Sequence, residues 1–164
     1  MRRSISSQRG MTLAEVLVAL PIITIGLLAL LSAIPLATYA TQDGSQTSTA
    51  TFLANQRLEQ VRNAQWSAIP AVDALGVSAS STAAPQSGGT TTFADESPMA
   101  APYAAYTRQV RITDCGTGGG CTGIINSGMR LVTVTVTYKP LSATGQTAGP
   151  SSRAVPVSMV IAQR

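Results

Sequence analysis

The longest apolar run in the chain extends from Val16 to Ala37 and contains no charged side chain. As an α-helix, these 22 residues would be about 33 Å long, because each residue adds about 1.5 Å. The hydrocarbon core of a bilayer is roughly 30 Å thick. Three arginines lie before the run, within residues 1–10, whereas the first cation after it is Arg57. The positive-inside rule therefore predicts a membrane-spanning helix whose N-terminus is cytoplasmic.

Two ordinary interpretations compete for this run. A secretory signal peptide has a shorter apolar core, of about 7–15 residues, and Thr38-Tyr39-Ala40 is a poor cleavage site. A plain membrane anchor also fits the hydropathy. Glu15 indicates something more specific, because an uncompensated carboxylate at the edge of a spanning helix costs about 2–3 kcal/mol. Either Glu15 lies among the headgroups near Arg9, or it pairs with a positive group formed when the basic head is removed.

Cleavage between Gly10 and Met11 would create such a group, an α-ammonium at Met11. Glu15 lies four residues further on and shares the helical face of Met11. In a stack of such helices, Glu15 could also meet the Met11 ammonium of a neighbouring chain.

The segment at residues 9–20 (RGMTLAEVLVAL) resembles the class III prepilin signal of type IV pilins and type II secretion pseudopilins. The shared features are a basic leader, a glycine at the cut, an apolar first mature residue and glutamate as the fifth mature residue. The resemblance implies that prepilin peptidase cuts after Gly10, that Met11 is then N-methylated, and that Glu15 sets the register of assembly. Methionine stands at position 11 where phenylalanine is common in the family.

The helix is expected to continue beyond the membrane. Pro21 and Pro35 each remove one helical hydrogen bond, so we expect kinks there; family members often carry a proline in this span. The segment after residue 50 predicts an amphipathic helix that ends before Pro70, with a broad apolar stripe formed by Phe52, Leu53, Leu58, Val61, Ala64 and Ile69. A continuous helix from Met11 to Ile69 would be roughly 90 Å long.

Three segments near the C-terminus alternate apolar and polar residues with the period of a half-buried strand: Tyr106–Thr113, Leu131–Tyr138 and Ala154–Ala162. Pro156 suggests that the last is an edge strand. We expect an antiparallel meander whose apolar face packs on the helix, an α+β fold with a long N-terminal helix on a small sheet. The predicted divisions are a leader (1–10), a transmembrane and assembly helix (11–40), its amphipathic continuation (41–69), an Ala/Ser/Thr/Pro-rich connection with a short strand at Thr91–Ala94 (70–102) and a sheet domain (103–164).

The residues that usually carry chemistry are sparse. The chain has no histidine and two cysteines, which excludes a four-ligand zinc site, and Asp95-Glu96 lacks further hard ligands for a metal. Translocation to an oxidising compartment predicts a disulfide between Cys115 and Cys121. We therefore expect no enzyme activity, no metal and no cofactor.

Three functions remain. The short length, the single small sheet and the Thr/Val strand pattern resemble minor pilins of the pilus-modification (V-type) group, which implies a structural subunit that passes from the inner membrane into a fibre. Its partners would be prepilin peptidase and other pilins. The alternatives are a minor pseudopilin of type II secretion, in a periplasmic pseudopilus, and a membrane-anchored adhesin or DNA-capture module. Outside residues 1–10 the net charge is only +1, so nucleic acid is a weak candidate partner. If the chain binds nucleic acid, we expect a local patch of exposed arginines to do so: Arg57, Arg62, Arg108 and Arg111.

Overall fold

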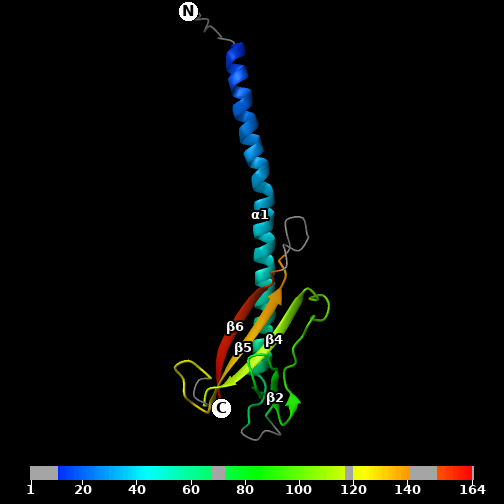
Figure 1. Cartoon of the computed structure of the whole chain (residues 1–164), viewed down its shortest axis with the longest axis vertical. Coiled ribbons are helices and arrows are strands. Elements are labelled where there is room, and N and C mark those ends of the chain that lie inside the picture. The colour runs from blue at the N-terminus through cyan, green and yellow to red at the C-terminus, as the bar shows by residue number, and fades with distance from the viewer. Residues whose placement is uncertain (1–10, 68–72, 117–119, 141–150, 164) are drawn as a thin grey trace, which may run out of the picture.

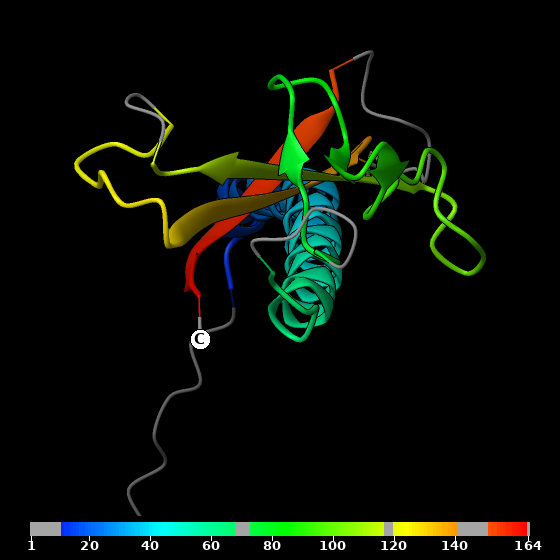
Figure 2. The same ribbon diagram turned by 90° about the horizontal axis from the view of Figure 1, so that it is seen from below.

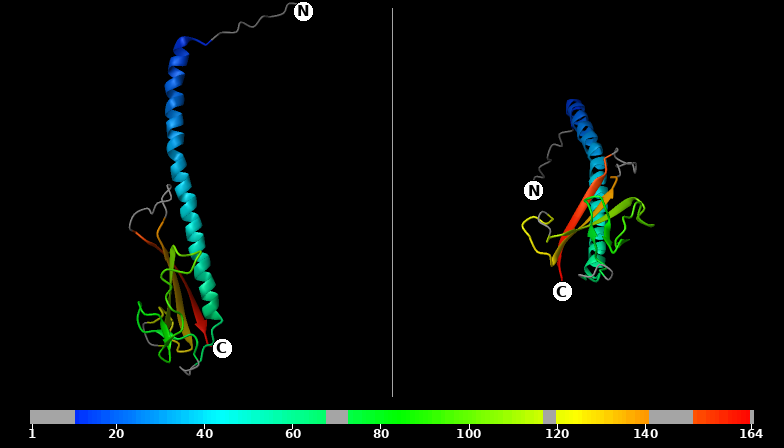
Figure 3. Two further views of the ribbon diagram at one scale, coloured as in Figure 1. Left: turned by 90° about the vertical axis from the view of Figure 1, so that its right-hand side faces the viewer. Right: turned by 60° about the horizontal axis from the view of Figure 1, so that its bottom comes forward.

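One long helix and two small sheets make up the computed structural model, which describes residues 11–67, 73–116, 120–140 and 151–163. The first half of the helix extends well beyond the sheets, and its second half lies beside them (Figures 1 and 3). The predicted α+β fold is thus confirmed. The elements are α1 (Leu13–Arg62), β1 (Val77–Ser78), β2 (Pro85–Ser87), β3 (Thr90–Thr91), β4 (Tyr106–Asp114), β5 (Met129–Tyr138) and β6 (Arg153–Ala162).

The larger sheet is the predicted antiparallel meander. It has the order β4-β5-β6, with Val110 opposite Val134 and Val134 opposite Val157. Its strands begin and end within two residues of the predicted bounds, because the alternation of Val and Thr follows the pleat closely. β6 is an edge strand of this sheet, so Pro156 lies where the missing N–H is tolerated.

The core lies between the second half of α1 and one face of the meander (Figure 2). Seen along the helix axis, α1 covers the middle of the sheet, as the apolar stripe predicts. Each large apolar side chain buried in this core stabilises the fold by about 1.5–3 kcal/mol, because it is removed from water. The buried residues come from α1 (Ala50, Leu53, Ala54, Leu58 and Val61), from β4 (Val110 and Ile112) and from β5 (Val132, Val134 and Val136).

The helix ends earlier than predicted. Its last residue is Arg62, and the predicted end at Ile69 lies outside the described residues. Asn63 closes the helix by donating its N–H to the Glu59 carbonyl at 3.1 Å. Two residues later the chain is no longer helical, and the Gln65 carbonyl accepts the Ala74 N–H at 2.9 Å. At about 1.5 Å per residue, α1 is therefore about 75 Å long rather than 90 Å.

Phe52 was wrongly assigned to the buried stripe: its side chain is 59% exposed. Buried positions on α1 recur at 50, 53, 54, 58 and 61, the spacing of one helical face. Residue 52 lies on the opposite side of the helix, because it is two residues from 50 and from 54 and each residue turns the helix by about 100°.

The connection after the helix is more structured than predicted. β1, β2 and β3 form a second, small antiparallel sheet, in which Val77 is opposite Gln86 and Ser87 is opposite Thr90. The strand predicted at Thr91–Ala94 begins one residue earlier and ends at Thr91. Gly76, just before β1, has a φ of 67°, and a Cβ there would lie 2.7 Å from the Gln86 carbonyl oxygen.

A disulfide joins Cys115, just after β4, to Cys121, as expected, with their Cα atoms 4.9 Å apart. The Cys115 N–H also donates to the Met129 carbonyl at 3.0 Å. The bond therefore restrains the connection between β4 and β5 where that connection leaves the sheet.

A buried ion pair fastens the connection to the sheet. Arg130 occupies a core-facing position of β5, and its guanidinium donates to the Asp73 carboxylate at 2.8 Å. Asp73 also accepts the backbone N–H groups of Leu75 and Gly76, at 3.1 and 3.2 Å. The Arg130 guanidinium lies 4.6 Å from the centre of the Trp66 ring, a favourable cation–π geometry. One arginine thus joins the end of α1, the start of the connection and β5.

Replacing Asp73 should therefore be costly. In Asp73→Ala, Arg130 is left buried without its anion, which costs about 3–5 kcal/mol of unfolding free energy. The more exposed pair between Asp95 and Arg111 provides the control, because Asp95→Ala should cost about 1 kcal/mol or less. Denaturant unfolding of the detergent-solubilised chain, followed by fluorescence of Trp66, its single tryptophan, measures both. Equal losses for the two variants would contradict the structural role of Asp73.

Candidate assembly helix and processing site

The N-terminus of α1 is closed by a capping box. Thr12 is the N-cap, and its hydroxyl oxygen accepts the Glu15 N–H at 3.3 Å. In return, Glu15 Oε2 accepts the Thr12 N–H at 2.8 Å and the Thr12 hydroxyl at 3.0 Å. These reciprocal bonds satisfy donors that would otherwise be unpaired in the first helical turn. The sequence Thr-Leu-Ala-Glu therefore both starts the helix and fixes the Glu15 carboxylate beside the backbone of Thr12.

Met11 directly precedes this cap and is not helical, and its side chain is 75% exposed. Gly10 and the rest of the predicted leader lie outside the described residues. The structure thus places two of the predicted site residues, Met11 and Glu15, within one turn of each other. Cleavage after Gly10 and N-methylation of Met11 stay predictions.

The first half of α1 is apolar on every side. Fourteen large apolar side chains between Leu13 and Leu36 are exposed, by 42% at Val16 and up to 79% at Leu13. This is the one helix in the described part of the chain that is long and apolar enough to cross a membrane. Hydroxyl groups in this half donate to carbonyls of their own helix, as Ser32 does to Ala29 at 2.7 Å and Thr38 to Pro35 at 2.9 Å. Such a surface is stable in lipid or against other apolar helices, because it leaves few polar groups in need of water.

The two prolines do not interrupt the helix. Pro21 and Pro35 lie inside α1, which is continuous from Leu13 to Arg62 and curves gently along its length (Figure 3). The kinks expected at Pro21 and Pro35 stay a prediction.

The predicted patch of exposed arginines is wrong. Arg108 is 6% exposed and donates to both carboxylate oxygens of Glu96, at 3.0 and 2.9 Å. Arg57 reaches the same carboxylate at 2.7 Å. The adjacent Asp95 accepts two hydrogen bonds from Arg111, at 2.7 and 2.8 Å.

The two adjacent acids, Asp95 and Glu96, therefore form ion pairs with three of the four arginines. The fourth, Arg62, pairs with Glu59 on its own helix at 3.1 Å. Because these arginines are ion-paired, the structure gives the DNA-capture alternative little support.

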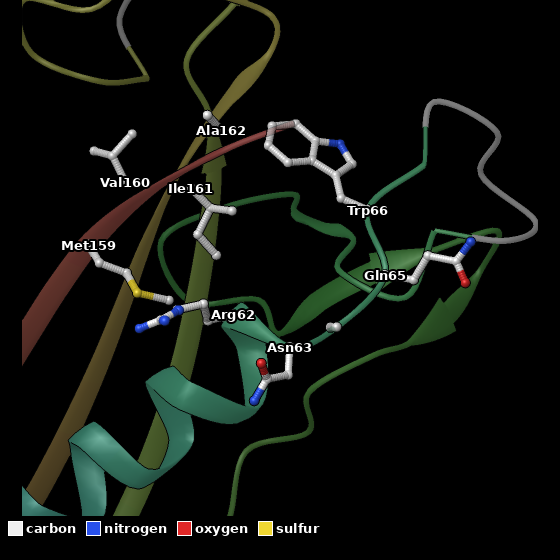
Figure 4. A pocket seen from close by; sticks show the side chains of 9 residues that line it. Arg62, Asn63, Gln65, Trp66, Met159, Val160, Ile161 and Ala162 are labelled. Carbon is white, nitrogen blue, oxygen red and sulfur yellow. The ribbon is translucent and has the colours of Figure 1, made fainter. Parts of the chain in front are cut away.

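A shallow groove of about 580 Å³ lies at the free end of the domain, between the end of α1 and the end of β6 (Figure 4). Trp66, Met159 and Ile161 supply much of its apolar wall, and Arg62, Asn63 and Gln65 supply its polar groups. No carboxylate or thiol belongs to the nine residues that line it, so its walls bring no acid–base pair together.

Comparison with known families finds one match, to a family model described as the prokaryotic N-terminal methylation motif, at residues 5–31. This motif, together with the long helix packed on an antiparallel sheet, supports a type IV pilin-like prepilin. The motif supports a membrane-anchored pilin or pseudopilin and implies processing by prepilin peptidase and assembly with other pilins. No curated protein and no solved structure matches the chain.

The Asp95–Arg111 pair gives the domain a pH dependence of known sign. Hydrogen bonding from the Arg111 guanidinium lowers the pKa of the Asp95 carboxyl below its usual value. The stability from this pair is therefore present above about pH 4, the ordinary carboxyl range, and is lost as the pH falls through the lower folded pKa. Urea unfolding at about pH 7 should show Asp95→Asn up to 1 kcal/mol less stable than the natural chain, and this difference should shrink as the pH falls below the ordinary carboxyl range. A gap that widens on acidification would contradict the pairing.

Proposed function

We propose that the chain is a minor type IV pilin that enters a pilus through its N-terminal helix. The observation that carries this proposal is the juxtaposition at the helix N-terminus. An exposed, non-helical Met11 stands one turn before a fixed carboxylate, Glu15, and a long apolar helix follows. After cleavage at Gly10, the Met11 ammonium would supply the cation that this carboxylate needs in apolar surroundings.

The same arrangement supports a defined orientation. Arg2, Arg3 and Arg9 precede the apolar helix, and the sheet domain follows it. The leader would stay in the cytoplasm, within reach of the peptidase, while the domain crosses the inner membrane. The disulfide between Cys115 and Cys121 fits an oxidising compartment beyond the membrane.

Assembly would then be an exchange of one apolar environment for another. The exposed surface of α1 leaves lipid and packs against the equivalent helices of neighbouring subunits, which costs little because both environments are apolar. Register would come from Glu15, because its charge is matched only at the height where a neighbouring Met11 ammonium lies.

The pilus and pseudopilus roles differ in where the fibre lies. Shearing of intact cells releases a surface pilus, whereas a pseudopilus stays in the periplasm. Finding the mature chain in the sheared fraction supports the pilin role. Its confinement to the cell, together with loss of a secreted protein on deletion, would establish the type II secretion role instead.

Replacing the glycine before the cut should block processing. In Gly10→Arg, a bulky cation occupies the position where the resemblance requires the smallest residue. We expect the chain to keep its first ten residues, as read by mass spectrometry of the membrane fraction. Ser7→Arg, which adds the same charge three residues upstream, is the matched control and should be cleaved. A mature Met11 N-terminus in Gly10→Arg would refute the assigned cleavage site.

Removing the glutamate should separate insertion from assembly. Glu15→Val makes the helix more apolar, so membrane insertion and cleavage should continue. The amount of chain in the fibre should fall by about tenfold or more, because one charge pair in an apolar environment is lost. The fraction in sheared fibres relative to membranes, measured by immunoblotting, gives the result. Glu59→Val, which removes an exposed carboxylate outside the apolar half, is the control. Normal incorporation of Glu15→Val would contradict the register role.

A further inference from the structure

The stretch of helix without free charge is longer than a membrane requires. Between Glu15 and Arg57 the chain has one charged residue, Asp43. Its carboxylate accepts a hydrogen bond from Arg153 at the start of β6, at 2.6 Å, and is 21% exposed. Asp43 is therefore neutralised on the side of α1 that faces the sheet. The opposite side of the helix carries no charge until Glu59, about 65 Å from Glu15.

Phe52 lies in line with apolar side chains of the first half of α1, which is apolar on every side. Residues 16 and 34 precede residue 52 by 36 and 18 positions, which are ten and five full turns at 3.6 residues per turn. Val16, Ile34 and Phe52 therefore lie on one line along the helix, and their side chains are 42, 56 and 59% exposed. Leu20, Ile23, Leu27 and Leu30 fall beside that line and are exposed too.

Phe52 is unusual among the exposed side chains. In the described residues after Leu36, the other large apolar side chains with high exposure are Ile125 and Val160, and neither lies on α1. Between Leu36 and Phe52 this side of the helix carries small hydroxyl side chains, including exposed Ser45 and Ser48, and no charged side chain. Thr38 and Thr41 lie there, and their hydroxyls donate to carbonyls of α1 itself, at 2.9 Å to Pro35 and Thr38.

We propose that Phe52 is the outer end of the helix–helix contact surface and that it packs on the exposed apolar segment, residues 16–36, of an adjacent subunit with the same helix. This inference rests on the proposed function and names the contact that assembly makes beyond the membrane thickness. Val16 to Phe52 covers about 55 Å, roughly 25 Å more than a bilayer core. For Phe52 to meet residues 16–36, this neighbour is displaced along the fibre by about 25–55 Å, so it is a different subunit from the one whose Met11 lies at the height of Glu15.

The contact is continuous with the surface that assembly already buries, and it brings an aromatic ring against Leu, Ile and Val side chains. No carboxylate or guanidinium has to be desolvated to form it, since Asp43 is held by Arg153 on the other side. Phe52 thus adds apolar contact area in the fibre and adds none in the free subunit.

The test uses the full chain in cells that assemble the fibre. Phe52→Lys should be inserted and processed normally, because residue 52 lies outside the membrane span and its side chain contacts solvent in the subunit. Its fraction in sheared fibres should fall by about tenfold or more, and Phe52→Leu should restore at least half of the loss. The matched control is Ile125→Lys, which places the same charge on another exposed apolar position, 83% exposed, away from α1.

Incorporation of Phe52→Lys at the level of the natural chain would overturn the inference. So would an equal loss for Ile125→Lys, because any added charge on the domain would then suffice. These failures are distinct from failure of the proposed function. If the natural chain is absent from fibres, or if Glu15→Val assembles normally, the proposed function fails and this contact fails with it.

Discussion

The first half of α1 imposes the constraint on which the rest of the structure depends, because its apolar side chains have no partner within the chain. Each of the large ones gains about 1.5–3 kcal/mol when it is removed from water. Fourteen such side chains between Leu13 and Leu36 are exposed. A lipid bilayer and a bundle of like helices are the two surroundings that cover a helix on all sides. Membrane anchoring and fibre assembly are therefore two solutions to one physical problem.

The second half of the same helix solves the problem internally. From Ala50 onward its apolar residues fall on one face, and the alternating valines of β5 cover them. α1 thus changes from apolar on all sides to amphipathic without a break in its hydrogen bonding. The sheet domain is consequently fixed to the anchor by packing rather than by a linker, and the ion pair between Asp43 and Arg153 holds it at the point where the helix emerges.

Local patterns predicted the elements well and the long-range polar contacts poorly. The strands followed from the strict alternation around Val134, and the helix from its apolar run. The helix end was wrong because apolar spacing continues to Ile69, whereas Trp66 is drawn out of helical geometry to lie against Arg130, a residue 64 positions away. No window of local sequence contains that contact.

Arg108 was misjudged for a different reason. We predicted Arg108 to be exposed because it is charged. Its place between Tyr106 and Val110 puts it on the inward face of β4. Its burial becomes acceptable only through Glu96, which a separate segment supplies. At the assembly site, position and residue type were enough to predict Met11 and Glu15, but the hydrogen bonds of Thr12 to Glu15 appear only once the helix has formed.

The distribution of charge supports the role proposed for Glu15. Carboxylates throughout the domain are ion-paired with arginines: Asp43, Glu59, Asp73, Asp95 and Glu96 each have one within 3.1 Å. Within the part of the chain that the structure describes, Glu15 has hydrogen bonds from Thr12 and no ion pair. A chain that pairs at least five of its six other acids with arginines would gain little from an uncompensated carboxylate at the membrane edge. Removal of the leader would produce a new cation, the α-ammonium of Met11, close to Glu15. Cleavage after Gly10 would therefore supply the partner that Glu15 lacks.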